Sequence, residues 1–250
     1  NNIIEALYKE VAGVVKMTDP CEVERELVGA SVVGDVTGFL YTDKLVKRTS
    51  RVRFSSLVPS LDAVSTGAAA SYPQFHVRYA PPDRQELQQI YYLESGSALY
   101  TLSAVFVASD VAELEYCGKE SALPDKKERV EAALKALVAL LDGLAFGAKK
   151  SRNNPVWDVR SLVVSVSKGP IEFVVSPAVD KDYFKNTVQR AATISNVFTS
   201  EGKHLLQIKM FKYDREGLTE LQSSVPINIS THDTHTEALE RASSLVLQLI

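Results

Sequence analysis

The sequence has no run of about 18 consecutive apolar residues, the length that a membrane-spanning helix requires, so we expect no membrane contact. It contains only two cysteines, Cys21 and Cys117, which lie far apart and without metal-type spacing. We therefore expect two reduced thiols in a cytoplasmic protein. The motifs H-E-x-x-H, C-x-x-C and G-x-S-x-G and any paired acidic metal motif are also missing. The sequence thus predicts no metal, no cofactor and no catalytic site.

The composition is that of an ordinary folded domain. Of the 250 residues, 45% are hydrophobic and 24% are charged, which argues against a disordered chain. Helical and strand patterns alternate without an internal repeat or a low-complexity tract, so the predicted fold class is α+β. We expect a single domain over residues 1–250 with an inserted β-rich subdomain at about 43–95.

Hydrophobic spacing predicts the individual elements. The clearest helix covers residues 125–143, where one apolar stripe runs from Val130 to Leu141. Thr234 and Glu237 fit a capping box at the start of a closing helix. Further predictions are helices over 1–16 and 181–194, and strands over 27–41, 74–79, 97–108, 156–167 and 204–213. We also expect an edge strand or partly exposed ribbon over 48–58, a linker over 18–27, and loops or turns over 62–73 and 80–89.

Charge is distributed unevenly although the net charge is only −3. Between Lys44 and Arg84 there are seven basic and two acidic residues, whereas from Asp214 to the end there are six acidic and two basic residues. Such a division suits an anionic partner on one face of the protein.

The segment KRTSRVRF concentrates cations with hydroxyls. Arginine offers charge and a fork of donors to phosphate oxygens, and hydroxyls add neutral donors. The same pattern is typical of a solvated sheet edge that charge protects from aggregation, so both interpretations stay open. The candidate phosphate contacts in this segment are Lys47, Arg48, Ser50, Arg51 and Arg53.

The strand QFHVRY places Gln74, His76 and Arg78 on the face opposite Phe75 and Val77. Three polar side chains on one strand face form a strip that can meet an anion. A lone histidine is more often structural or simply exposed, and we identify no partners for a catalytic triad.

The loop GLAFGAKKSRNNP carries Lys149, Lys150, Ser151 and Arg152. It is not a nucleotide-binding P-loop, because its glycine spacing differs and because it follows a helix and precedes a strand. The negative end of the preceding helix accounts for the two lysines but not for Arg152. We interpret the loop as a clamp for phosphates.

Read together, the segments GDVTGFLY, KRTSRVRFSSLVPSL, QFHVRY, ESGSALYTLS, ERVEAALKALVALLDG, GAKKSR and PVWDVRSLVVSVSKGPIEF are similar to the CRISPR-associated autoregulator DevR family, in its archaeal type I-A branch. The resemblance runs from about Asn1 to Phe173 and continues more loosely to the C-terminus. It implies an RRM-like, ferredoxin-like core enlarged by insertions, with a first core strand that precedes Asn1 and is missing here.

The resemblance also implies a function. Members do no chemistry; copies line up along a CRISPR RNA in the Cascade complex, together with other Cascade subunits, and present the RNA to target DNA for pairing. The segments RTSR, QFHVR and GAKKSR match those on the RNA-facing side. Two alternatives stay open: a metal-independent endoribonuclease with His76 as general base, and a DNA-binding autoregulator.

Overall fold

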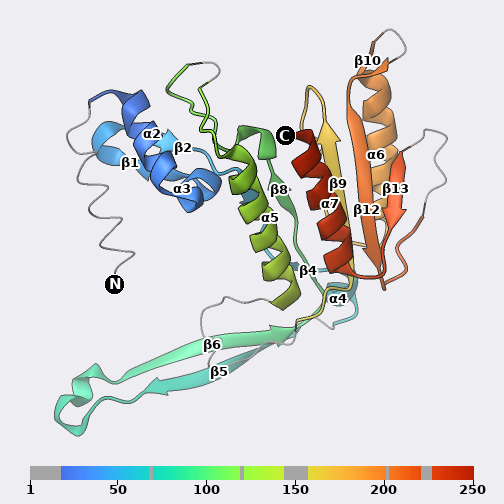
Figure 1. Ribbon diagram of the computed structural model, residues 1–250. Helices are drawn as coiled ribbons and strands as arrows, with labels where there is room; N and C mark the ends of the chain where they lie inside the picture. Colours follow the sequence, from blue (N-terminus) through green and yellow to red (C-terminus); the bar gives the residue numbers. More distant parts are fainter. Residues whose placement is uncertain (1–17, 68–69, 119–120, 144–156, 201–202, 221–226) are drawn as a thin grey trace.

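The computed structural model describes residues 18–67, 70–118, 121–143, 157–200, 203–220 and 227–250 of the chain (Figure 1). Helices and short strands mix along it, which confirms the predicted α+β class. The helices are α2 (Pro20–Ala30), α3 (Val32–Thr37), α4 (Leu61–Ser65), α5 (Lys126–Gly143), α6 (Tyr183–Val197) and α7 (His235–Leu249), with 3-10 turns η1 (Thr42–Lys44), η2 (Pro82–Leu87) and η3 (Ala108–Asp110). The strands are β1 (Phe39–Tyr41), β2 (Val46–Arg48), β3 (Val52–Phe54), β4 (Val58–Pro59), β5 (Ala70–Arg78), β6 (Gln89–Ser97), β7 (Tyr100–Thr101), β8 (Ala104–Phe106), β9 (Ser161–Lys168), β10 (Thr199–Ser200), β11 (Lys203–His204), β12 (Gln207–Asp214) and β13 (Asn228–Thr231).

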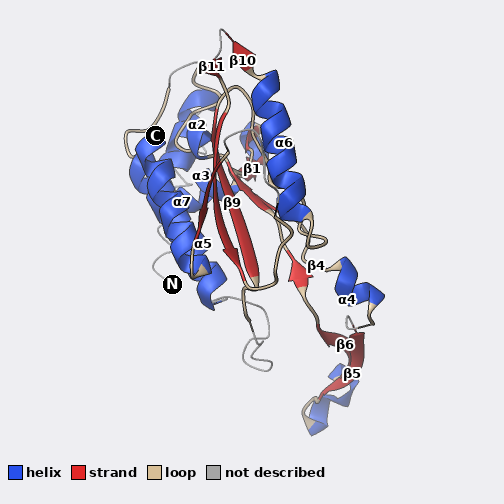
Figure 2. Ribbon diagram, turned by 90° about the vertical axis from the view of Figure 1, so that its right-hand side faces the viewer, coloured by secondary structure: helices blue, strands red, loops and turns tan. Residues whose placement is uncertain are grey.

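A sheet with the strand order β13-β12-β9 is covered by helices on both faces (Figure 2). Its central strand β12 runs antiparallel to β9 and parallel to β13. Alternation along β12 sends Ile208 and Met210 into a cluster with α6, and Phe211 and Tyr213 into a cluster with α7. Each fully buried apolar side chain contributes roughly 1.5–3 kcal/mol, so both faces of this sheet are core.

The predicted helices over 125–143 and 234–250 are confirmed as α5 and α7. Val130 of α5 is fully buried, and Val246 of α7 packs against the same cluster, so the two helices lie side by side (Figure 1). The Thr234 hydroxyl accepts the Glu237 amide hydrogen at 3.1 Å, which is the predicted N-cap. The predicted helix at 181–194 and the strands at 156–167 and 204–213 are confirmed as α6, β9 and β12.

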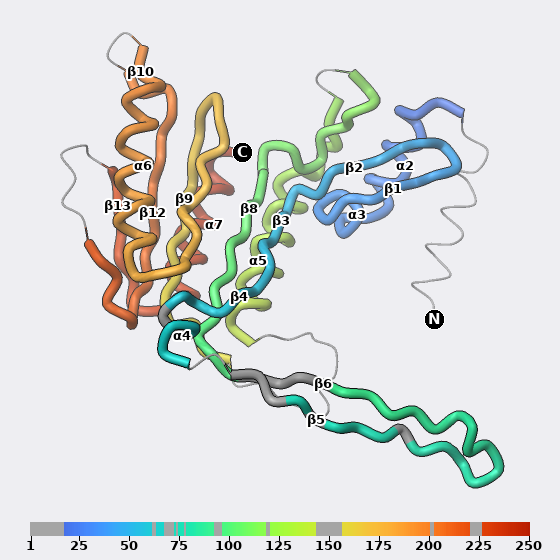
Figure 3. The backbone as a smooth tube through the Cα atoms, turned by 180° about the vertical axis from the view of Figure 1, so that it is seen from behind, coloured from blue at the N-terminus to red at the C-terminus, as the bar shows by residue number. Residues whose placement is uncertain are grey.

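One long ribbon leaves the body and returns to it. The antiparallel pairs β3–β8, β4–β7 and β5–β6 follow one another along this ribbon. The pair β5–β6 lies farthest from the body and projects away from the helices; we call it the projecting ribbon (Figure 3). The predicted strand at 74–79 is part of β5, and the edge strand or ribbon predicted over 48–58 is divided among β2, β3 and β4. The prediction missed β6, placed a single strand over 97–108 where β7 and β8 lie, and placed a loop over 62–73 where α4 and the start of β5 lie.

Two predictions near the N-terminus are wrong. The linker predicted at 18–27 belongs to helix α2, which Asp19 caps by accepting the amide hydrogen of Cys21 at 3.3 Å, with Pro20 in the first helical position. The strand predicted at 27–41 is mostly α2 and α3, and only residues 39–41 extend. Val28 and Val36 are buried from helical positions, whereas Val32 and Val33 are exposed.

Gly38 ends helix α3 in the left-handed region, at φ 77°. A Cβ at this position would lie 2.5 Å from the carbonyl oxygen of Arg48, so the close approach of the chain to β2 requires glycine here. The predicted helix over residues 1–16 lies outside the described residues.

The two cysteines form a disulfide, which corrects the expectation of two reduced thiols. Cys21 at the start of α2 is bonded to Cys117, across 96 residues of sequence, with the Cα atoms 4.6 Å apart. Spacing along the chain could not reveal the bond, since only folding brings the two residues together. Within the part of the chain that the structure describes, no helix is long and apolar enough to cross a membrane.

Candidate nucleic-acid interface

The structure divides the cationic segment 47–53 between the protein interior and the surface. In β2, the side chains of Val46 and Arg48 point inward while Lys47 between them is exposed. In the following residues, Arg51 is buried, whereas the side chain of Arg53 is 51% exposed. Alternation in β2 turns Lys47 outward and Arg48 inward. Arg51 lies in the break between β2 and β3, so Lys47 and Arg53 are the exposed cations of this segment.

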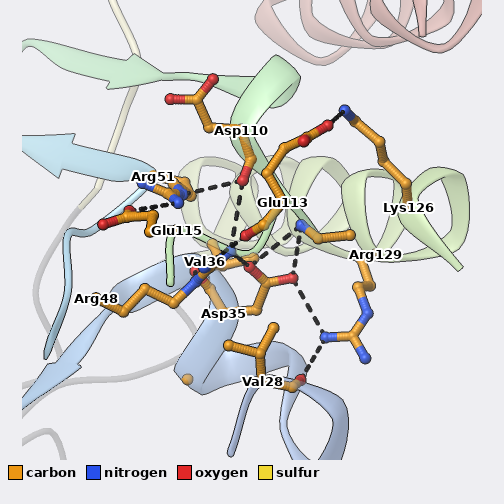
Figure 4. Close-up of polar contacts among 12 residues, drawn as sticks. Val28, Asp35, Val36, Arg48, Arg51, Asp110, Glu113, Glu115, Lys126 and Arg129 are labelled. Carbon is orange, nitrogen blue, oxygen red and sulfur yellow. Dashed lines mark hydrogen bonds and ion pairs between the residues drawn. The ribbon is translucent and has the colours of Figure 1, made fainter. Parts of the chain in front are cut away.

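Arg48 is the centre of a buried ionic cluster (Figure 4). Its guanidinium donates to the Glu24 carboxylate at 3.1 Å and to the carbonyl oxygen of Glu113 at 2.8 Å. It also contacts the carboxylate of Asp35 and donates to the Asp35 carbonyl oxygen at 3.1 Å. Because a buried charge is tolerated only when it is paired and hydrogen-bonded, these contacts make Arg48 a structural residue.

The two carboxylates of the cluster hold separate parts of the chain. Glu24 accepts the amide hydrogens of Glu115 at 2.9 Å and Tyr116 at 2.8 Å. Asp35 accepts the amide hydrogen of Ala112 at 3.0 Å. Ala112 has a φ of 65°, which is unusual for a residue other than glycine. The cluster thus fixes the segment that follows β8 against α2 and α3.

A second arginine extends the cluster to helix α5. Arg129 donates to Asp35 at 3.2 Å and to the carbonyl oxygen of Val28 at 2.8 Å. It also pairs with Asp125 one turn earlier, at 2.8 Å, and this hydrogen bond lowers the pKa of the Asp125 carboxyl. Asp35 therefore lies between two arginines, Arg48 and Arg129, and three segments of the chain meet there (Figure 4).

Arg51 and Ser50 also have partners inside the protein. Arg51 donates to the carbonyl oxygen of Asp110 at 3.1 Å and pairs with Glu115 at 2.8 Å. The Ser50 hydroxyl donates to the carbonyl oxygen of Val36 at 3.3 Å. Like Arg48, these two residues bond to other parts of the protein, so we do not propose them as RNA contacts.

Arg53 is different because its partner is equally exposed. It pairs with Glu172 at 2.7 Å, where the two side chains are 51% and 53% exposed. An ion pair in this setting contributes about 0–1 kcal/mol, so a phosphate can replace the carboxylate at little cost. Lys47 makes no ion pair in the described structure; only its backbone amide is engaged, by the Tyr116 hydroxyl at 3.2 Å.

The predicted polar strip lies on the projecting ribbon. The His76 ring stacks on Tyr91 of β6 with ring centroids 5.5 Å apart, and for Gln74 and Arg78 only the backbone of β5 is described. On the same ribbon, Phe75 and Tyr92 pair edge to face and remain 58% and 74% exposed. The ribbon therefore offers aromatic side chains to a partner.

The predicted clamp residues Lys149, Lys150, Ser151 and Arg152 lie outside the described residues. The described ends of this loop are linked, since the indole of Trp157 donates to the carbonyl oxygen of Leu141 at 2.8 Å. This bond holds the start of the next segment against the end of α5.

Sequence reasoning missed one cationic residue, Arg190 of α6. It is exposed, donates at 3.1 Å both to the carbonyl oxygen of Val174 and to the Ser176 hydroxyl, and lies 5.6 Å from the ring centre of Phe173. No sequence pattern marks it, because an exposed arginine in an amphipathic helix is ordinary. Among the residues with assigned positions, no group of three histidine, cysteine or acidic side chains is placed to hold a metal ion.

Comparison with known proteins identifies the family. The family model for the CRISPR-associated negative auto-regulator DevR/Csa2 matches residues 3–188. The chain therefore belongs to the DevR/Csa2 family, which confirms the resemblance inferred from its ordered segments.

Similar proteins come from archaea. "CRISPR-associated protein Cas7/Csa2 1" of Saccharolobus solfataricus is 36% identical over 204 residues, which are 77% of this chain and 63% of the relative. "CRISPR-associated aCascade subunit Cas7/Csa2 2" of the same organism is 36% identical over 70% of this chain and 55% of the relative. "CRISPR-associated protein Cas7/Cst2/DevR" of Thermoproteus tenax is 32% identical over 58% of this chain. The chain thus spans somewhat more than half the length of the first two relatives.

Proposed function

We propose that the chain is a non-catalytic scaffold subunit of an archaeal Cascade complex in the cytoplasm. In this role it binds CRISPR RNA, polymerises along it with copies of itself, contacts other Cascade subunits, and presents the RNA to target DNA. The relative whose name includes "aCascade subunit", at 36% identity over 70% of this chain, supports the assembly part of the proposal.

The observation that carries the proposal is the projecting ribbon β5–β6. An isolated two-stranded hairpin is marginally stable in water, and this one keeps Phe75, Ile90 and Tyr92 more than half exposed. Aromatic residues on an exposed ribbon suit a surface that becomes buried in an assembly. A scaffold whose copies and RNA pack against one another buries such a surface.

The outward cations support RNA as the anionic partner. Lys47 and Arg53 are exposed to solvent, whereas Arg48 and Arg51 form ion pairs inside the protein. Segment 47–53 therefore offers two cations to RNA and not a broad basic surface. A subunit that holds only a few phosphates needs no more, because neighbouring copies each contribute their own.

The order of elements supports an RRM-like core as part of the proposal. Strand β3 pairs antiparallel with β8, helix α5 follows, and β9 comes next, which is the β-β-α-β half of a β-α-β-β-α-β core. Among the described strands, β9 pairs only with β12.

Electron microscopy of the purified chain with and without single-stranded RNA tests the proposal. We expect extended helical arrays with RNA and none without it. Fluorescence anisotropy with labelled single-stranded RNA should show binding that weakens with salt and varies little with sequence. Absence of both arrays and RNA binding would reject the scaffold function.

The endoribonuclease alternative has a separate test. It predicts that the chain cleaves CRISPR repeat RNA without added metal and that His76→Ala abolishes cleavage. Our proposal predicts that the RNA remains intact after long incubation with excess protein. The autoregulator alternative, which matches the family description, predicts tight binding of duplex DNA in the same anisotropy assay.

A further inference from the structure

A groove lies where the projecting ribbon joins the body of the protein. Its volume is about 450 Å³, and it separates the β4–β7 ladder from the extended segment that leads into α6. The ribbon side contributes hydroxyl side chains, and the facing segment over residues 174–179 contributes mainly valine, proline and alanine. Arg190 lines the same groove and is the charged residue there.

Arg190 is held in place without being neutralised. Its Nη1 donates to the Val174 carbonyl oxygen and the Ser176 hydroxyl, both at 3.1 Å, and its guanidinium lies over the Phe173 ring. Its Nε and Nη2 make no hydrogen bond within the described structure, so a fixed guanidinium retains a free edge. Among the arginines whose side chains are described, only Arg25 and Arg190 lack a carboxylate within ion-pair distance.

Two hydroxyls of the groove are also available. The side chains of Ser56 and Ser103 make no hydrogen bond in the described part of the protein, although both residues line the groove. By contrast, the neighbouring Ser55 hydroxyl accepts the Ser103 amide hydrogen at 2.9 Å. A preoriented guanidinium and neutral donors that line one groove are the kind of donor set that binds phosphate oxygens.

The segment that lines the groove also leads to a cation of the candidate interface, Arg53. Arg53 pairs with Glu172, and Arg190 bonds Val174 and Ser176, so both arginines border the same extended segment. The Glu172 carboxylate is engaged by Arg53 and not by Arg190. The positive charge of Arg190 is therefore left to an external anion.

We propose that this groove binds a phosphodiester of single-stranded RNA, with Arg190 as the charged contact and Ser56 and Ser103 as neutral donors. The apolar side chains of segment 174–179 then cover a ribose or a base face. This inference rests on the proposed RNA-binding function and adds a subsite that the cationic segments of the sequence do not contain. It commits to RNA because the successive phosphates of one strand can meet Arg190 and also the exposed cations Arg53 and Lys47.

The test is anisotropy of a labelled single-stranded RNA of mixed sequence over a series of potassium chloride concentrations. Arg190→Gln removes the charge but keeps an amide that can donate to Val174. We expect the affinity to fall about tenfold and the salt slope to flatten by about 0.7, the loss of one phosphate contact. The matched control is Arg25→Gln on α2, which removes the other unpaired arginine and should change neither quantity.

A second variant does not touch the contacts of Arg190. Ser56→Asp places a negative charge in the groove and should weaken RNA binding at least as much, whereas Ser244→Asp on the outer surface of α7 should not. If the unchanged protein binds RNA but Arg190→Gln and Ser56→Asp bind equally well, the groove is not a subsite and the proposed function stands. If the unchanged protein binds no RNA, both proposals fail. If Arg190→Gln instead abolishes self-association measured by sedimentation without RNA, the groove holds a second copy and the RNA assignment is overturned.

Discussion

Arg48 donates to the carboxylate of Glu24 at 3.1 Å, and both side chains are 0% exposed. The two residues lie 24 positions apart, and Asp35 contacts the same guanidinium. Segment 47–53 looks uniformly basic in sequence, yet Arg48 lies in the interior while the adjacent Lys47 is exposed. Function and stability should therefore separate between adjacent residues.

Arg48→Ala should destabilise the fold strongly. The substitution leaves Glu24 buried without a cation and leaves Asp35 with Arg129 alone. Breaking a buried ion pair in this way costs about 3–5 kcal/mol. Urea unfolding followed by circular dichroism measures the change in the free energy of unfolding. The interpretation is wrong if the variant unfolds at the same urea concentration as the unchanged protein.

Lys47→Ala should have the opposite profile. Its side chain is exposed and makes no ion pair in the described structure, so the free energy of unfolding should change by less than about 0.5 kcal/mol. RNA affinity should fall and its salt dependence should flatten by about 0.7, as for one lost phosphate contact. Thermal unfolding together with anisotropy gives both quantities, and unchanged RNA binding would remove Lys47 from the interface.

Reduction of the Cys21–Cys117 disulfide should lower stability without changing the fold. The bond closes a loop of 96 residues, for which the chain-entropy model gives about 4–5 kcal/mol. We expect the reduced protein to unfold at a lower urea concentration, and the variant with both cysteines replaced by serine to be insensitive to reductant. Thiol titration of the denatured, unreduced protein should find no free thiol; two free thiols would contradict the bond.

Alkaline pH should destabilise the protein through Tyr183. Burial raises the pKa of the Tyr183 hydroxyl to about 12, against a reference value of 10.0, while its hydrogen bond with Ser161 acts in the opposite direction. Below pH 10 both the folded and unfolded states keep the proton, and between pH 10 and 12 only the unfolded state releases it. Stability is therefore complete below pH 10 and falls by up to about 3 kcal/mol as the pH approaches 12.

Tyr183→Phe is the control for this titration. The difference in unfolding free energy between the two proteins should shift in favour of the variant as the pH rises from 10 to 12. If the difference stays constant over this range, the hydroxyl of Tyr183 titrates normally in the folded protein.

Removing the three predicted phosphate contacts in the loop after α5 should weaken binding equally for RNAs of different sequence. Lys149→Ala, Lys150→Ala and Arg152→Ala together should flatten the salt slope by about 2, as three lost phosphate contacts predict. The matched control removes three exposed cations elsewhere, Lys127, Lys135 and Arg241. Equal effects of the two triple variants would show that only net charge matters and would reject the loop's specific role.

Much of the regular structure could be predicted from local pattern. The apolar stripe of α5, the Thr234 cap of α7 and the extended segments β9 and β12 follow from spacing and cap chemistry, which act over a few residues. The helix α2 was missed although Asp19 and Pro20 form a helix start, because acidic residues in its first turns suggested a linker. The ordered segments also sufficed to recognise the family.

The interface could be predicted only in outline. Composition and charge placed cations at 47–53, but alternation from the buried Val46 was needed to see that Arg48 points inward. Arg190 gave no signal at all, because its proposed role depends on a groove formed by segments that are far apart in sequence, at residues 55–58, 101–103 and 174–179. Whether an arginine has an acidic partner depends on which residues folding brings near it, and the sequence around the arginine does not show this.

The sequence by itself determined the helical and extended segments, the uneven distribution of charge and the family to which the chain belongs, because these depend on residues close together in the chain. The tertiary structure alone decided which cations are free. It brought Glu24 and Asp35 to Arg48, Glu115 to Arg51 and Cys21 to Cys117. It left Lys47 and Arg190 without an acidic partner among the residues whose positions are described. A cation that folding has buried with an internal carboxylate is not available to an external anion, whereas an exposed cation is.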